Sequence, residues 1–189
     1  MSRPQALLLV AAALLIVAIL LPWWEITMHA PQYPSGLHVT TWFYRVTGDV
    51  REVDGLNHYI GFMPLAKMAT LERGLALILG PLAVLCVAGA AFVRSRFLAA
   101  LLAVPVVIVP LFFVADMAAW LAYAGTHLDP NAALSSSVAP WTPPLIGTGG
   151  VGQFHTQSSF GLGFYVALLA AVCAVVAIVQ RLRLAKHAA

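Results

Sequence analysis

The chain has 189 residues, of which 61% are hydrophobic and only 9% are charged. Because soluble domains carry roughly a quarter of charged residues, this composition excludes a soluble enzyme, a disordered chain and a nucleic-acid-binding protein. The formal net charge of +3 and the two cysteines indicate neither a strongly basic surface nor a disulfide framework. We therefore expect an integral membrane protein.

Apolar stretches long enough to cross a bilayer occur four times. A spanning helix needs about 20 apolar residues for a hydrocarbon core of about 30 Å, and the four stretches cover residues of about 5–24, 74–93, 97–120 and 161–179. The first follows Arg3 as a signal peptide would, but it ends in a Pro-Trp-Trp sequence typical of an interface anchor. Pro105 and Pro110 predict a kink in the third.

The basic residues predict the orientation of these spans. Six of the ten lie on one side, namely Arg3, Arg94, Arg96, Arg181, Arg183 and Lys186. An excess of Lys and Arg marks the cytoplasmic side, so we expect a multi-pass protein of the cytoplasmic (inner) membrane with both termini inside. The sequence then predicts an all-α membrane protein. Residues 1–189 would form a single membrane domain, a four-helix transmembrane bundle with long extracytoplasmic loops at about 25–73 and 124–160.

The first predicted loop has the pattern of a β-hairpin. Residues 37–46 are rich in β-branched and aromatic side chains, Gly48 lies at a turn-like position, and residues 50–53 are expected to return as a strand. A hairpin centred on Gly48 places His38 opposite His58, with Cβ atoms about 5 Å apart and close enough to share one metal. The alternative is that the two histidines lie in separate parts of the loop.

Histidine and methionine are concentrated on the predicted outward side. Five of the six histidines and four of the five methionines lie there, including His38, His58 and Met63. Imidazole and thioether ligands suit copper, especially the cuprous ion, so these three residues are candidate metal ligands. The alternative is that the loops carry solvated or hydrogen-bonded polar residues, as loops of any membrane protein do. No spacing matches a zinc signature.

Asp116 is the acidic residue that stands out. About 20 residues of helix, or roughly 30 Å, separate it from Arg96, which places it at the outer membrane boundary. Trp120 and Tyr123 follow at helical spacing and share its face if the helix continues. An ionisable group near the bilayer suggests a functional site, and interfacial anchoring is the alternative explanation of the aromatic residues.

Several segments of the two loops are distinctive when they are taken together: Ala30–Leu37, Gly48–Val53, Asn57–Gly61, Leu128–Pro130 and Trp141–Gly147. In these segments the chain resembles small four-span bacterial membrane proteins of copper-enzyme gene clusters, in particular the NosB-type proteins of clade II nitrous oxide reductase clusters. The resemblance implies an accessory role in copper delivery, maturation or electron supply for an exported copper reductase. It also implies His58 as the best candidate ligand. The expected pattern has Met directly after Gly61, whereas this chain has Phe62 and then Met63, which puts Met63 in doubt.

The sequence therefore leads to one main hypothesis and one alternative. The main hypothesis is a non-enzymatic integral membrane accessory protein that binds copper, or a copper-carrying protein partner, on its extracytoplasmic face. The alternative is a structural or assembly subunit of a membrane complex, with the loops as a docking surface and no metal bound. Catalysis is not expected, because no nucleophile, base and orienting group come together in the sequence.

Overall fold

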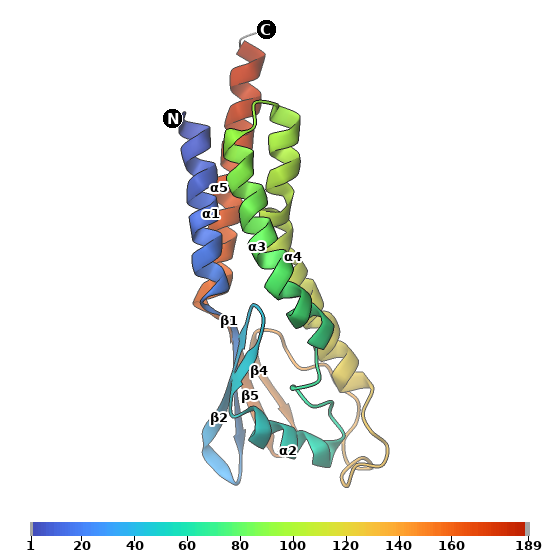
Figure 1. Cartoon of the computed structure of the whole chain (residues 1–189). Helices are drawn as coiled ribbons and strands as arrows, with labels where there is room; N and C mark the ends of the chain where they lie inside the picture. The colour runs from blue at the N-terminus through green and yellow to red at the C-terminus, as the bar shows by residue number, and fades with distance from the viewer. Residues whose placement is uncertain (1, 188–189) are drawn as a thin grey trace.

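The computed structural model describes residues 2–187, which form five helices and a five-stranded antiparallel sheet. Four of the helices lie side by side at one end. The sheet lies at the other end together with the remaining helix, which covers residues 50–60 (Figure 1). The predicted all-α four-helix transmembrane bundle is therefore wrong, because both predicted loops contribute strands to one sheet.

Three helices of the described residues are long and apolar enough to cross a membrane: α3 (Thr70–Phe92), α4 (Arg96–Thr126) and α5 (Leu162–His187). Helix α1 (Arg3–Ile19) is also apolar but has 17 residues, or about 25 Å of helix. The expected first span at 5–24 is shorter as a helix, because residues 22–24 already belong to the first strand. The three long helices indicate an integral membrane protein.

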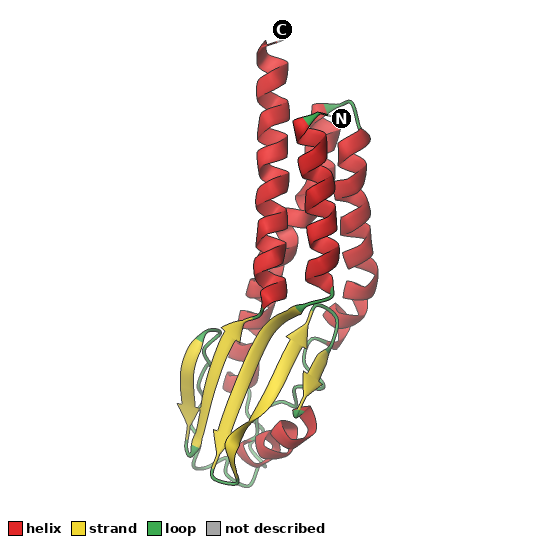
Figure 2. Ribbon diagram, turned by 90° about the vertical axis from the view of Figure 1, so that its left-hand side faces the viewer, coloured by secondary structure: helices red, strands yellow, loops and turns green. Residues whose placement is uncertain are grey.

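The sheet has the strand order β3-β2-β1-β5-β4. Its strands are β1 (Pro22–Ala30), β2 (Tyr33–Trp42), β3 (Val46–Gly48), β4 (Gly147–Val151) and β5 (Phe154–Phe160). The central strand β1 follows α1 directly, and its antiparallel neighbour β5 leads directly into α5. The two innermost strands thus continue from two helices that pack against each other, which fixes the sheet to the end of the helical layer (Figure 2).

The two faces of the sheet differ in polarity because side chains alternate along each strand. On β1, Trp24 is buried and Ile26 is half-buried, whereas Glu25 and His29 are exposed. The apolar face packs against α2 (Val50–Ile60). The polar face, which we call the outer sheet face, looks away from α2 (Figure 2).

The predicted hairpin centred on Gly48 is wrong. Strand β2 pairs with β3 on one side and with β1 on the other, and the register places His38 opposite Thr27 rather than His58. Gly48 ends β3 with φ of +98°, and helix α2 follows. Residues 50–60 form a helix because their buried side chains, Val53, Asn57 and Ile60, recur every three to four residues.

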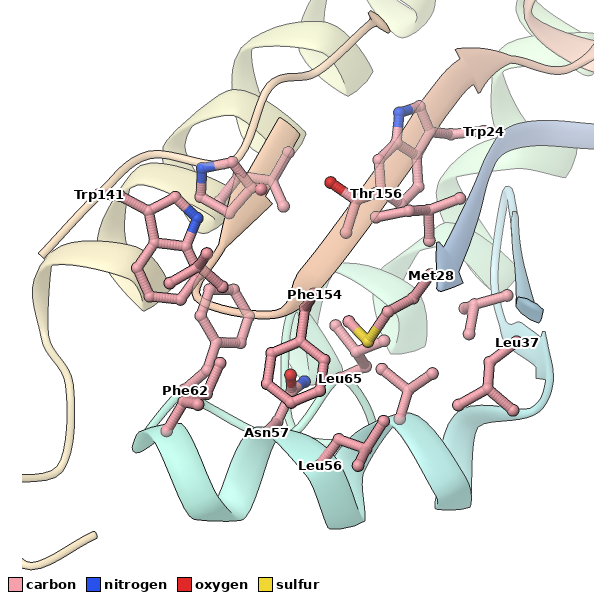
Figure 3. A pocket seen from close by; sticks show the side chains of 18 residues that line it. Trp24, Met28, Leu37, Leu56, Asn57, Phe62, Leu65, Trp141, Phe154 and Thr156 are labelled. Carbon is pink, nitrogen blue, oxygen red and sulfur yellow. The ribbon is translucent and has the colours of Figure 1, made fainter. Parts of the chain in front are cut away.

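A small cavity of about 60 Å³ remains between α2 and the sheet. Met28 and Phe154 reach into it from the strands, and Leu56 and Asn57 reach into it from α2 (Figure 3). Asn57 is buried, with 3% of its surface exposed. A space of this size holds a few water molecules at most.

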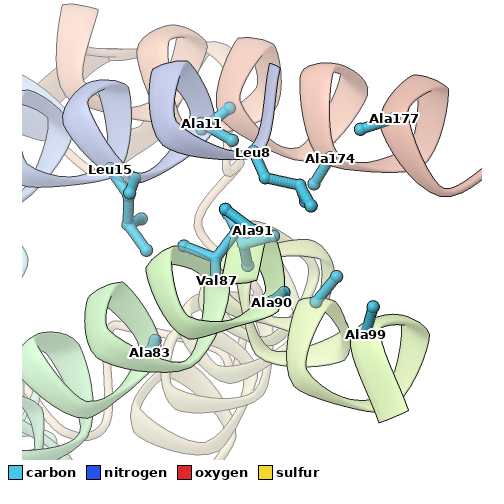
Figure 4. Close-up of a cluster of buried hydrophobic side chains, with 14 residues drawn as sticks. Leu8, Ala11, Leu15, Ala83, Val87, Ala90, Ala91, Ala99, Ala174 and Ala177 are labelled. Atoms are coloured by element: carbon cyan, nitrogen blue, oxygen red, sulfur yellow. The ribbon is translucent and has the colours of Figure 1, made fainter. Parts of the chain in front are cut away.

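The helices pack through small side chains. Helix α1 contacts α3 and α5, and α4 contacts the same two helices. The buried cluster between them consists mainly of alanines, including Ala11, Ala90, Ala99 and Ala174 (Figure 4). Small residues let helix backbones approach closely, which is the usual basis of helix association in lipid.

Trp23 joins the four packed helices to the sheet. Its side chain is fully buried, and its indole N–H donates a 2.8 Å hydrogen bond to the carbonyl oxygen of Ala18 near the end of α1. Its ring lies 5.1 Å from that of Phe43, 4.9 Å from that of Phe113 and 6.3 Å from that of Phe164, measured between centroids. One residue therefore connects α1, the β2–β3 turn, α4 and α5.

We predict that Trp23→Ala lowers the free energy of unfolding by about 3–5 kcal/mol, because it opens a large cavity in a fully packed joint. Thermal unfolding in detergent micelles measures the change. Phe97→Ala is the control, since the Phe97 side chain is 78% exposed and its loss should shift stability by no more than about 0.5 kcal/mol. Equal shifts for the two variants would contradict the role of Trp23.

Candidate functional site: an acid-lined pocket between helices and sheet

A pocket of about 490 Å³ lies between α3, α4 and the β2–β3 edge of the sheet. We call it the acid-lined pocket. Helix α3 lines it with Leu75, Leu79 and Leu82, and α4 lines it with Ile108 and Phe112. Its volume lies within the range of about 300–1,000 Å³ that is typical of ligand sites.

The pocket exists because the two helix pairs diverge. Helices α1 and α5 end at the sheet, whereas α3 and α4 slant away from them toward the sheet end of the molecule (Figure 1). The contact between Gly80 and Phe43 marks where α3 leaves the rest of the layer. A Cβ atom at Gly80 would lie 2.8 Å from Cε1 of Phe43 and 3.3 Å from Cδ1 of Ile19.

Three charged residues line this otherwise apolar space: Glu72, Arg73 and Asp116. Glu72 and Arg73 lie in the first turn of α3, and Asp116 lies on α4. The two carboxyl groups are near enough to interact electrostatically. Oε2 of Glu72 is buried and has no hydrogen-bond partner within residues 2–187, a condition that is rare for a buried polar atom.

Arg73 is held in place by backbone acceptors. Its Nε donates to the carbonyl oxygen of Ala69 at 3.3 Å, and its Nη2 donates to that of Ala66 at 2.7 Å. Ala69 precedes α3 with φ of +50°, so the arginine also braces a strained turn. These bonds point the guanidinium toward the backbone before α3 rather than toward a carboxylate, and they fix its position at the sheet end of the pocket.

Asp116 is the sequence candidate that lies in this pocket. The prediction that α4 continues past it holds in the structure, because the helix runs to Thr126, and Trp120 lines the pocket one turn further on. Glu72 also lines the pocket, but it was not a candidate from the sequence, because an acidic residue at the start of a span looks like an ordinary interface charge. The sequence gives no signal that α3 and α4 bring the two acids to one cavity.

The candidate copper ligands lie apart. His38 is on the outer sheet face, where its Nδ1 lies 3.0 Å from Oγ1 of Thr27. His58 is exposed on α2, with its ring centroid 6.2 Å from that of Tyr59. Met63 packs beside Ile60 after the end of that helix. Within the part of the chain that is described, no three His, Cys, Asp or Glu residues form a group that could hold a metal ion.

A different set of histidines does share one surface. His29 on β1 pairs directly with His155 on β5, and His38 on β2 pairs with Thr27, two residues before His29. All three are exposed on the outer sheet face. The ring of His29 leans over Gly36 and that of His155 leans over Gly150, so the rings point to opposite sides of the pair. Sequence reasoning missed this set because β5 was not predicted.

No protein-family model matches the chain, and no curated protein matches it either. The fold itself defines the class of protein: an integral membrane protein whose apolar helices carry a β-sheet cap at one end, with an acid-lined pocket where the two meet.

We predict that Gly80→Ala lowers the free energy of unfolding by about 1–3 kcal/mol, because the added methyl group must displace the ring of Phe43. Gly89→Ala on the same helix is the matched control, since nothing lies within 4 Å of a Cβ atom there. That change should leave stability unchanged or raise it by up to about 1 kcal/mol. Thermal unfolding in micelles compares the two, and a stable Gly80→Ala variant would contradict the close contact.

Proposed function

We propose that the protein is a non-enzymatic integral membrane accessory protein that holds an apolar molecule of the membrane in the acid-lined pocket, beneath its sheet cap. The size and lining of the pocket carry this proposal. A space of about 490 Å³ that is lined by leucine, isoleucine and aromatic side chains is suited to an apolar occupant. Leu79, Leu82 and Ile108 are about half exposed, so the space is open on one side, where an apolar molecule of the membrane can enter.

The charged groups of the pocket favour recognition over chemistry. Two carboxylates and one guanidinium at the edge of an apolar space can pair with the polar end of an amphiphile, while the remainder of the pocket surrounds its apolar part. The alternative is a structural or assembly subunit, in which a helix of a protein partner would occupy the same pocket. The two proposals differ in the molecule that should purify with the protein, which is a small apolar molecule in the first and a polypeptide in the second.

The placement of basic residues supports a cytoplasmic-membrane orientation with the cap outside. Arg94 and Arg96 flank the turn between α3 and α4, at the end of the helices opposite the sheet (Figure 1). Arg181 of α5 lies at the same end, where its guanidinium donates to the carbonyl oxygens of Ala90, Ala91 and Val93 at 2.9–3.2 Å. This basic end would face the cytoplasm, and the sheet would then meet an extracytoplasmic partner.

We predict that the protein purified in mild detergent retains about one apolar molecule per chain and that Ala76→Phe removes it. Ala76 lines the pocket, so a phenyl ring there occupies part of the space. Ala119→Phe is the matched control, because Ala119 is exposed on α4 and is not among the lining residues. Solvent extraction followed by mass spectrometry counts the molecule. Equal retention by both variants, or no retained molecule, would overturn the proposal.

A role in copper handling is a second proposal, which the histidines of the outer sheet face favour. Cross-strand neighbours have Cβ atoms about 4.5–5.5 Å apart, so His29 and His155 can share a metal once their rings turn toward each other. Both side chains are exposed, and exposed side chains change rotamer within nanoseconds. Two imidazoles on an open surface would form a labile site, which suits transfer of copper better than storage.

We predict that cuprous ion binds this face with one equivalent per chain and that His29→Ala/His155→Ala weakens the affinity at least tenfold. His58→Ala should bind as the unmodified protein does, because His58 lies on α2 and not on the sheet. Competition with a chromophoric cuprous chelator measures both affinities. Loss of binding in His58→Ala alone would show that His58 is the ligand, as the sequence resemblance implies. Absence of cuprous binding by the unmodified protein would contradict the copper proposal.

A further inference from the structure

We infer that the occupant of the acid-lined pocket is a zwitterionic phospholipid with a primary amine headgroup, of the phosphatidylethanolamine class. This inference rests on the proposed function, in which the pocket holds an apolar molecule of the membrane, and it adds the chemistry of that molecule. Three features support it: the charges, their position within the pocket, and the length of the apolar part.

The charges of the pocket complement those of a phosphoethanolamine group. A primary ammonium has three N–H donors, and the carboxylates of Glu72 and Asp116 are acceptors that line the same space. In particular, Oε2 of Glu72 is buried and has no donor within the described residues, and an ammonium group would supply one once the carboxyl group rotates toward the pocket. Arg73 provides the positive charge that a phosphate requires.

The charged residues lie at one end of the pocket. Arg73 and Glu72 stand in the first turn of α3 at the sheet end, whereas Cys86 and Pro105 line the opposite end. A molecule that fits this arrangement has a polar head at the sheet and an apolar chain that points along the helices. This is the orientation of a lipid whose headgroup lies at the membrane surface on the side of the sheet.

The pocket is at least as long as the hydrocarbon part of one leaflet. From Arg73 to Cys86 there are 13 residues of α3, or about 20 Å of helix. The hydrocarbon core of a bilayer is about 30 Å thick, so the chains of one leaflet reach about half of that. One acyl chain can therefore lie along the pocket, with Leu79 and Ile108 among the side chains that contact it.

The same groups select against other abundant headgroups. A quaternary choline has no N–H donor, so it leaves Oε2 of Glu72 without a hydrogen bond, which is costly for a buried acceptor. A glycerol headgroup leaves the lipid with a net negative charge, and two carboxylates repel it. The pocket should therefore prefer the amine over both.

The experiment uses the full-length protein in detergent, freed of lipid by extensive exchange. It is mixed with equal amounts of phosphatidylethanolamine, phosphatidylcholine and phosphatidylglycerol that carry identical acyl chains, and native mass spectrometry counts the bound lipids. We expect one phosphatidylethanolamine per chain, at least tenfold preferred over either competitor. Glu72→Gln and Asp116→Asn, made separately, should bring the ratio of amine to choline lipid close to one, and Arg73→Gln should weaken all three lipids.

Glu25→Gln is the control, because Glu25 is exposed on β1 and does not line the pocket. This variant should keep the preference of the unmodified protein for phosphatidylethanolamine. Equal binding of the amine and choline lipids by the unmodified protein would overturn the inference. So would a quinol or a partner polypeptide as the retained occupant that Ala76→Phe removes. Retention of a non-phospholipid leaves the proposed function intact, whereas the absence of any occupant removes both.

Discussion

Two covalent joints, from α1 to β1 and from β5 to α5, determine where every other part of this protein can lie. The strands that follow and precede these helices are neighbours in the sheet, and the N–H of Gly161 donates to the carbonyl oxygen of Trp23 at 2.9 Å where they meet the helices. A Cβ atom at Gly163 would lie 2.7 Å from the carbonyl oxygen of Pro22, so the approach is as close as glycine permits. The sheet is thereby a rigid continuation of two packed helices and not a domain on a linker.

The acid-lined pocket is a consequence of this rigid joint. Because β1 and β5 extend from α1 and α5, the sheet takes the space directly below those two helices, and α3 and α4 pass beside it (Figure 1). Phe43, at the β2–β3 turn, fits against Gly80 and packs on Trp23, and it lines the gap at that level. The gap extends along α3 to both sides of Gly80, and α3 and α4 carry their acidic residues at its sheet end.

The helical part of this fold could be predicted from the sequence, because α3, α4 and α5 are long apolar runs that end at arginines or polar residues. The sheet could not. The apolar run of α1 continues through Leu20 and Leu21 into Trp23 and Trp24, so the start of β1 resembled the end of a span. On β5 the residues that face α2 include Thr156 and Ser158, which gives no alternation of apolar and polar side chains for a strand prediction to detect.

The candidate site shows the same division between local and tertiary information. Asp116 was identified because a charge on a long apolar helix is conspicuous by itself. Glu72 was not, because its significance depends on the angle between α3 and α4, which helix packing and the position of the sheet decide. The predicted pairing of His38 with His58 was wrong for a related reason. It required residues 50–53 to form a strand, and the helical period of Val53, Asn57 and Ile60 places His58 on an exposed helix face instead.

The two acidic residues of the pocket, Glu72 and Asp116, do not contribute to the stability of the empty fold. The chain has only seven acidic residues, and two of them line an apolar pocket, where an ionised or unpaired carboxyl group lowers the stability of the fold. Packing would favour apolar residues at both positions, since leucine and phenylalanine already surround them. Under the proposed function, a donor group that enters the pocket would remove this penalty, and the occupied protein would be more stable than the empty one by linkage. The cost in the empty state would then be the physical source of the proposed headgroup selectivity.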